Sequence, residues 1–427
     1  MKTNIYSLLL ILVLFSCNTK SEQITSSEDY NAYLESKNES FENANKNFNF
    51  WTKKLEETPN QYPYLAKIAG SQSQIFSTTG RIENLIAAEK NLVQLNEKTN
   101  FNKAGYLRAL ARNYISQHRF KDALVLLEKA ETNGESLNGT HKMLFDVYME
   151  LGNDEKAKYY LEQIVDLKNF DYLIRTAKWN DHKGDLSAAI KYMEKAVEKA
   201  ESSNSKDLKQ WAYTNIADFY GHNGQIEKSY NYFLKSLELN PDDAYAKKGI
   251  AWIVYSYEHN PKEALRILDA ITTDYNAPDY YLLKAEISEY MNDDKAKTNY
   301  LASYKKAVNN KSYGEMYNAY NVELWAEDET NIDAALAVSK REIKNRATAH
   351  SYDLLAWSHL KNGDREKALK IVEDHVEGKT FEPKALYHLA EIYKANGETN
   401  KAKFLKEELL ESAFELGPIA AIKIEQI

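Results

Sequence analysis

A pattern of apolar and small side chains recurs at intervals of roughly 32–40 residues along most of this chain, and it constrains the fold more than any other feature. In the copy that spans residues 213–241, a first helix is predicted because four such side chains share one helical face: Tyr213, Ile216, Ala217 and Tyr220. Gly224 is expected to end this helix in a left-handed conformation. A second helix follows and stops at Asn240-Pro241. Each copy therefore predicts one helical hairpin, and the whole chain is expected to be all-α.

Small side chains occupy matching positions in the two helices of several copies. They are Ala111, Ala217, Ala356 and Ala390 in the first helix, and Ala123, Ser229, Ala368 and Ala402 in the second. Side chains of this size let two antiparallel helices approach closely. In this pattern the chain resembles the tetratricopeptide repeat family. The resemblance covers residues 64–416 in about ten copies, and it implies a right-handed superhelical solenoid that stays open along its inner face.

Two further segments flank the repeats. A single core stops growing at roughly 250–300 residues, so 427 residues need a repeat array or several domains. Residues 28–63 are expected to form an N-terminal helical pair, with Phe50, Trp51 and Leu55 on its second helix. Residues 417–427 are rich in isoleucine and are expected to fold back over the last hairpin, because terminal repeats need a cap.

The first residues are organised like a secretory signal. Lys2 supplies a positive charge, residues 8–15 are an unbroken apolar run, and Ser16 precedes Cys17. The run is far shorter than the ~20 residues that cross a bilayer as a helix. Residues 14–17 resemble the lipobox of bacterial lipoproteins, which implies that residues 1–16 are removed and that Cys17 is acylated. The alternative is an ordinary signal peptide with an incidental cysteine, but the single cysteine of the chain lies at the cleavage point.

The segment after the cysteine is predicted to connect a membrane to the folded repeats. Residues 17–27 are mostly polar and are expected to form a flexible tether. Asn18 stands where an aspartate would retain a lipoprotein at the inner membrane in some bacteria. The sequence therefore predicts a lipid-anchored protein of the cell envelope, attached through Cys17 and placed in the outer membrane.

The composition favours neither catalysis nor nucleic-acid binding. The formal net charge is −8, whereas proteins that bind nucleic acid cluster Lys and Arg to neutralise phosphates. The single cysteine excludes a Cys-based metal site. No histidine pair has the spacing of zinc hydrolases, and His359 replaces a core tyrosine of sister repeats. We therefore expect no catalytic site, no cofactor, no metal and no nucleic-acid partner.

In the resembled family, partner segments lie along the inner face, which the first helix of each repeat lines. The residues expected on that face lie between the core positions of these helices: Arg108, Arg112, Trp211, Asp218, Asp353, Trp357, Tyr387 and Glu391. Arg108 and Arg112 are one helical turn apart, so together they are candidates for binding a carboxylate. The alternative for both arginines is pairing with acidic residues of the chain itself.

These features together predict a membrane-anchored scaffold that binds a peptide or protein segment in a concave groove. A second hypothesis is a glycan-binding lipoprotein of nutrient uptake, in which Trp211, Trp252 and Trp357 would stack on sugars. Proteins of that kind that use such repeats carry long non-helical insertions between them, and the sequence shows no insertion of that size. The sequence identifies no individual partner.

Overall fold

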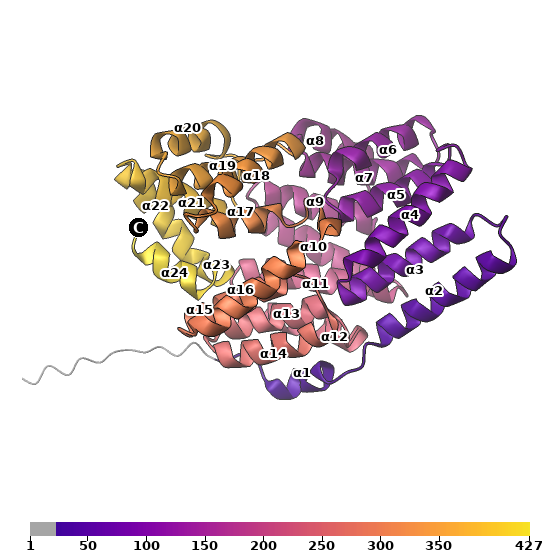
Figure 1. Cartoon of the computed structure of the whole chain (residues 1–427), viewed down its shortest axis with the longest axis horizontal. Helices are drawn as coiled ribbons and strands as arrows, with labels where there is room; N and C mark the ends of the chain where they lie inside the picture. Colours follow the sequence, from indigo (N-terminus) through magenta and orange to yellow (C-terminus); the bar gives the residue numbers. More distant parts are fainter. Residues whose placement is uncertain (1–22) are drawn as a thin grey trace, which may run out of the picture.

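The computed structural model describes residues 23–427, whose regular secondary structure is helical and includes no strand. Within these residues, consecutive helices pack as ten hairpins (Figure 1). The first helices are α3 (Tyr64–Thr79), α5 (Ala104–Ser116), α7 (Leu137–Glu150), α9 (Phe170–His182), α11 (Lys206–His222), α13 (Ala244–Trp252), α15 (Asp279–Tyr290), α17 (Asn318–Ala326), α19 (Ala349–Lys361) and α21 (Pro383–Ala395). The second helices are α4 (Ile82–Lys98), α6 (Phe120–Thr132), α8 (Asp154–Gln163), α10 (Leu186–Glu201), α12 (Ile226–Leu239), α14 (Pro261–Asp274), α16 (Asp294–Val308), α18 (Ile332–Asn345), α20 (Arg365–His375) and α22 (Thr399–Glu411). The predicted all-α array of tetratricopeptide-like hairpins is confirmed.

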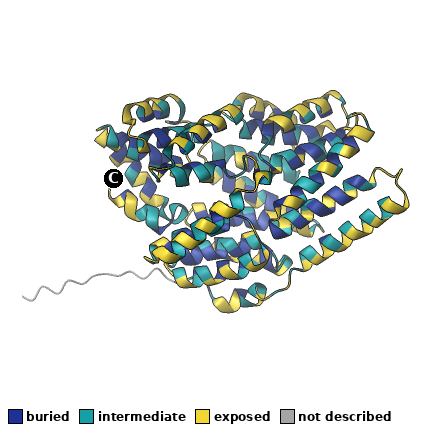
Figure 2. Ribbon diagram, in the orientation of Figure 1, coloured by how far each residue is buried: buried dark blue, intermediate teal, exposed yellow. Residues whose placement is uncertain are grey.

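Close packing inside each hairpin follows from the small residues singled out in the sequence. All eight are at most 2% exposed, because each lies where its helix crosses the other helix of the hairpin. The turn between the two helices needs a residue in the left-handed backbone conformation. Gly152 supplies it with φ 72°, whereas His118 and His259 adopt φ 58° and 53° in the same role. Figure 2 shows the buried residues concentrated between helices and the exposed ones on their outer sides.

Successive turns of the superhelix contact each other, which corrects the expectation of an open solenoid. Arg346 donates a hydrogen bond to Glu150, 196 residues earlier in the chain. Contacts at nearly the same separation recur along the molecule: Asn276 donates its N–H to the Thr79 carbonyl, and the ring of Phe381 covers Gly184. About six repeats therefore complete one superhelical turn. The second turn stacks on the first, and the segment that follows α18 returns beside the end of α7 (Figure 1).

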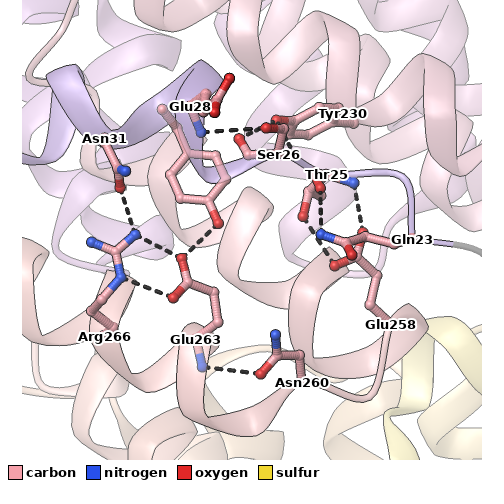
Figure 3. A network of polar contacts seen from close by, with 11 residues as sticks. Gln23, Thr25, Ser26, Glu28, Asn31, Tyr230, Glu258, Asn260, Glu263 and Arg266 are labelled. Atoms are coloured by element: carbon pink, nitrogen blue, oxygen red, sulfur yellow. Dashed lines mark hydrogen bonds and ion pairs between the residues drawn. The ribbon is translucent and has the colours of Figure 1, made fainter.

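The N-terminal helices do not form the pair predicted for residues 28–63. Helix α1 (Ser27–Leu34) packs on α12 and α14, whereas α2 (Glu39–Glu57) packs on α3. Residues 23–26, predicted as part of a tether, are also held: the N–H groups of Ile24 and Thr25 both donate to Glu258 Oε1, at 2.8 and 2.6 Å. We call residues 23–34 the N-terminal strap (Figure 3). Its location could not be predicted because its contacts lie one superhelical turn away.

The C-terminal residues fold back as expected but reach further than the last hairpin. Helices α23 (Ala413–Leu416) and α24 (Pro418–Glu425) follow α22. Ile424 is fully buried in the cluster that includes Leu405 and Leu409 of the last hairpin. In addition, α24 contacts α15, and α23 contacts α11 and the π-helical turn η1 (Ile253–Tyr257) that extends α13. A short 3₁₀ turn, η2 (Lys311–Tyr313), lies between α16 and α17 and touches α4.

Three predictions fall outside the described residues: the signal peptide 1–16, acylation at Cys17, and the tether from residue 17 to residue 22. Among residues 23–427, no helix combines the length and the apolar character that a membrane span requires.

Candidate functional site

First helices line the inside of the curve. Neighbouring first helices contact one another directly, as α5 does α7, α7 does α9, and α11 does α13. Polar side chains join them from one repeat to the next: Lys142 to Asp171 at 2.7 Å, and Lys248 to Asp279 at 2.8 Å. We call this surface the inner face. Because ion pairs between neighbouring repeats fix these side chains, a ligand on the inner face would meet charged and hydroxyl groups that are held in place.

The residues predicted for partner binding are spread along this face and differ in what they contact. Arg112 and Trp211 are exposed, and Trp211 packs edge-on against Phe170 with ring centroids 5.8 Å apart. Tyr387 and Glu391 are half-buried on α21. Arg108 is bound by the chain itself, since its Nη1 donates to the Glu135 carbonyl and to Thr140 Oγ1, both at 3.0 Å. The structure therefore does not bring the eight residues together into one site.

Two of the predicted residues lie in the interior instead of on an open surface. Asp353 is 0% exposed and Trp357 is 4% exposed. His388 of the next repeat lies against both: its Nδ1 is 2.9 Å from Asp353 Oδ2, and its ring stacks on Trp357 with centroids 4.0 Å apart. The expectation that they face a groove is corrected for this reason. The sequence spacing placed Asp353 and Trp357 on one side of α19, but it did not indicate that His388 covers that side.

Asp218 is the predicted residue that borders a cavity. A pocket of about 190 Å³ opens where α11, α13, η1 and α23 meet, and we call it the inner pocket. Its polar wall includes Asp218, His222, Tyr245 and Lys248. Its apolar wall comes from aromatic rings, among them Phe233, Trp252 and Phe414.

Hydrogen bonds and charges fix the polar wall. Tyr245 donates its hydroxyl to Asp218 Oδ2 at 2.7 Å, and Lys248 is held by Asp279. Burial raises the pKa of Asp218 to about 6, although the Tyr245 hydrogen bond opposes the shift. Burial likewise raises the pKa of Glu415 above its ordinary value. The wall offers hydroxyl, ammonium and carboxyl groups opposite an apolar surface, which suits binding through mixed polar and aromatic contacts.

Most residues of this pocket were not predicted from the sequence. Tyr245 and Lys248 carry a usable signal, because they lie at the same first-helix positions as predicted inner residues of other repeats. Phe414 and Glu415 carry no such signal, since they reach the pocket from beyond the last hairpin. In residues 23–427 no group of three or more His, Cys, Asp or Glu side chains is arranged to hold a metal ion.

Sequence comparison identifies the repeat that carries the pocket. Residues 212–243, which make up most of α11 and α12, match the family model described as Tetratricopeptide repeat. The chain contains a tetratricopeptide repeat. That repeat supplies Asp218 and His222 to the inner pocket. Among curated proteins, no relative matches the chain.

Solved structures with similar helical arrays include proteins of varied description. A tetratricopeptide repeat protein from Parabacteroides merdae is 17% identical, and the match covers 59% of this chain and 93% of that one with a TM-score of 0.39. Human IFIT1, solved as a dimer with m7Gppp-AAAA, is 14% identical, with 78% and 76% coverage and a TM-score of 0.46. Pseudomonas aeruginosa pilF is 16% identical, with 51% and 97% coverage and a TM-score of 0.37. At these scores the similarities say nothing about what this chain binds.

Proposed function

We propose that this protein is a scaffold of the bacterial cell envelope that holds a segment of a partner protein on its inner face. The observation that carries the proposal is the inner pocket, which the tetratricopeptide repeat lines on one side and which combines aromatic rings with fixed polar groups. Protein interfaces are enriched in Tyr, Trp and Phe and use a few placed polar groups for orientation. A protein segment that inserts a side chain between Tyr245 and Trp252 would use both.

The proposal includes a lipid anchor at Cys17, supported by the lipobox-like residues 14–17. Several acyl chains hold a protein stably at a membrane because each buried methylene contributes about 0.8 kcal/mol. The outer membrane is the proposed location, on the ground that no aspartate follows the cysteine. A Cys17→Ala variant is expected to leave the membrane fraction, and retention of that variant in washed membranes would contradict the anchor.

The inner face also favours a protein partner over nucleic acid. Asp181, Asp218, Glu382 and Glu415 are carboxylates at or near the inner pocket, and they would repel phosphates. This agrees with the net charge of −8.

Partner capture tests the proposed function. The full chain, affinity-tagged at its C-terminus, is recovered from detergent-solubilised membranes beside a Tyr245→Ala variant, and co-purifying proteins are identified. We expect a defined protein that the wild type retains and the variant loses. Tyr159→Ala, an exposed change on the second helix α8 and away from the inner face, serves as the control and should retain it. Retention on polysaccharide with no captured protein would overturn the proposal in favour of the glycan hypothesis.

A further inference from the structure

Helix α23 lies in the inner groove in the manner of a bound peptide. The Phe414 carbonyl accepts two hydrogen bonds from the first turn of the superhelix: from Trp252 Nε1 at 3.0 Å and from Ser256 Oγ at 2.6 Å. The Phe414 ring lies over Gly221, where an added Cβ would stand 3.0 Å from Cε1 of the ring. We call residues 412–417 the inner segment. The repeats accommodate this segment with Gly221, which leaves room for the ring, and with the Trp252 indole N–H and the Ser256 hydroxyl, which donate to its backbone.

The inner segment is held through one short helical turn. Helix α23 is only four residues long, and none of its residues is buried. Its connection to α24 runs through Gly417, which has φ 84° and lies so close to Trp252 that an added Cβ would be 3.0 Å from its ring. A single short turn of half-buried residues places little apolar area in the groove, so a longer segment can exceed its binding free energy.

The charge around Glu415 disfavours the inner segment as an occupant. The Glu415 carboxylate lies among Asp181 and Glu382, and these three come from three separate segments of the chain. His222 and His182 are the basic groups near these carboxylates, and His222 Nδ1 lies 3.9 Å from Glu415 Oε2. Like charges brought together at low solvent exposure repel each other. A basic residue in place of Glu415 would turn this repulsion into attraction.

We propose that the groove formed by α11 and η1 binds a helical turn of a partner protein that presents an aromatic side chain followed by a basic residue. The inner segment is the intramolecular occupant that this partner displaces. The partner's aromatic ring takes the place of Phe414 over Gly221, and its basic side chain takes the place of Glu415 beside Asp181 and Glu382. The inner pocket beside Phe414 receives the next side chain of the partner. This inference rests on the proposed function only in assuming that a protein segment binds the inner face.

Peptide binding to the full chain tests the inference. The probe is a fluorescent peptide with the sequence of residues 409–420 and lysine at the position of Glu415. A Phe414→Ala variant removes the competing ring, so we expect it to bind the probe about tenfold more tightly than the wild type does. Phe404→Ala removes a phenylalanine that is 71% exposed on α22 and should bind like the wild type. A second peptide with alanine in place of its phenylalanine should bind neither variant.

Two further variants keep the inference falsifiable if Phe414→Ala weakens the fold. Glu415→Lys replaces a partly exposed side chain and strengthens the hold on the inner segment, so it should lower the affinity for the probe below that of the wild type. Gly221→Leu fills the position of the ring and should abolish binding. Equal affinity of all variants, or equal binding of the two peptides, would overturn the inference. A partner that the wild type captures but the probe does not displace would overturn it while leaving the proposed function intact.

Discussion

The two ends of the chain dock on the same central repeats but on opposite faces. The N-terminal strap lies on the second helices α12 and α14, whereas the inner segment near the C-terminus lies on the first helix α11 and on η1. Both contacts join residues that are far apart in the sequence. They differ in burial and in the chemistry that makes them.

Two side chains of the strap are buried, and its polar groups find hydrogen-bond partners on the repeats. Thr25 is 5% exposed and Tyr30 is 2% exposed. Tyr30 donates its hydroxyl to Glu263 Oε1 at 2.7 Å, and Arg266, which also pairs with Glu263, donates to Asn31 (Figure 3). The inner segment, in contrast, has no buried residue in its helix and places a glutamate among carboxylates. The strap is therefore part of the folded body, whereas we propose that the inner segment can be exchanged for a partner.

The largest expected effect is the loss of the buried strap tyrosine. Tyr30→Ala removes a large side chain that is 2% exposed, so we expect the free energy of unfolding to fall by about 3 kcal/mol. Chemical denaturation of the full chain measures it. The control is Tyr159→Ala on α8, where the side chain is 52% exposed and little change is expected. Similar losses for the two variants would show that the strap is not integral to the fold.

Removing the acceptor beneath the strap should have a smaller effect. Glu258 accepts hydrogen bonds from the N–H groups of Ile24 and Thr25, and Glu258→Ala leaves both donors without this partner. We expect about 2 kcal/mol of destabilisation. Glu258→Gln keeps an acceptor oxygen and should lose less. Hydrogen exchange of residues 24–30, which should accelerate in the alanine variant, separates release of the strap from a global effect.

At the opposite end, Phe414→Ala should cost only about 1 kcal/mol, because the ring is only partly buried. The denaturation midpoint of this variant measures the difference from Tyr30→Ala. A loss as large as that of Tyr30→Ala would place the inner segment in the folded body too and erase the contrast between the two ends.

The smallest effects concern pH, and the two regions should respond in opposite directions. Arg266 lowers the pKa of Glu263 at the strap below 4.5 by hydrogen bonding. The stability from that pair is therefore present above the ordinary pKa and is lost as the pH falls below it. Burial raises the pKa of Glu286, which lies beside Gly417, from 4.5 to about 7. Its contribution is present below 4.5 and is lost as the pH rises toward 7.

Thermal unfolding of Glu263→Gln and Glu286→Gln over the range from about pH 4 to about pH 8 checks these signs. Glu263→Gln should be less stable than the wild type at neutral pH, with the gap closing in acid. Glu286→Gln should be more stable than the wild type at neutral pH, again with the gap closing in acid. If both variants were less stable than the wild type at neutral pH, or both more stable, the two carboxyl groups would not be in opposite environments.

Predictions from the sequence succeeded where contacts are local. The small residues Ala111 and Ala123 pack within one hairpin, and His359 is buried as expected, at 3% exposure. These predictions failed where the contacting side chain belongs to another part of the chain. Asp353 and Trp357 were expected on the inner face, but His388 from the following repeat covers them. Asp218 was expected there and does border the inner pocket, yet Phe414 and Glu415 reach that pocket from beyond the last hairpin, where no repeat spacing indicates them.

By itself, the sequence determined the helical hairpins, their small-residue crossings and the array they form, because each of these depends on side chains within about 34 residues of one another. Tertiary structure alone decided that the superhelix closes, that residues 23–34 are bound rather than free, and that Phe414 enters the inner groove. Those contacts join residues separated by a full superhelical turn, such as Glu150 and Arg346. Their pairing depends on the curvature accumulated over about six repeats, which periodicity along the chain does not specify.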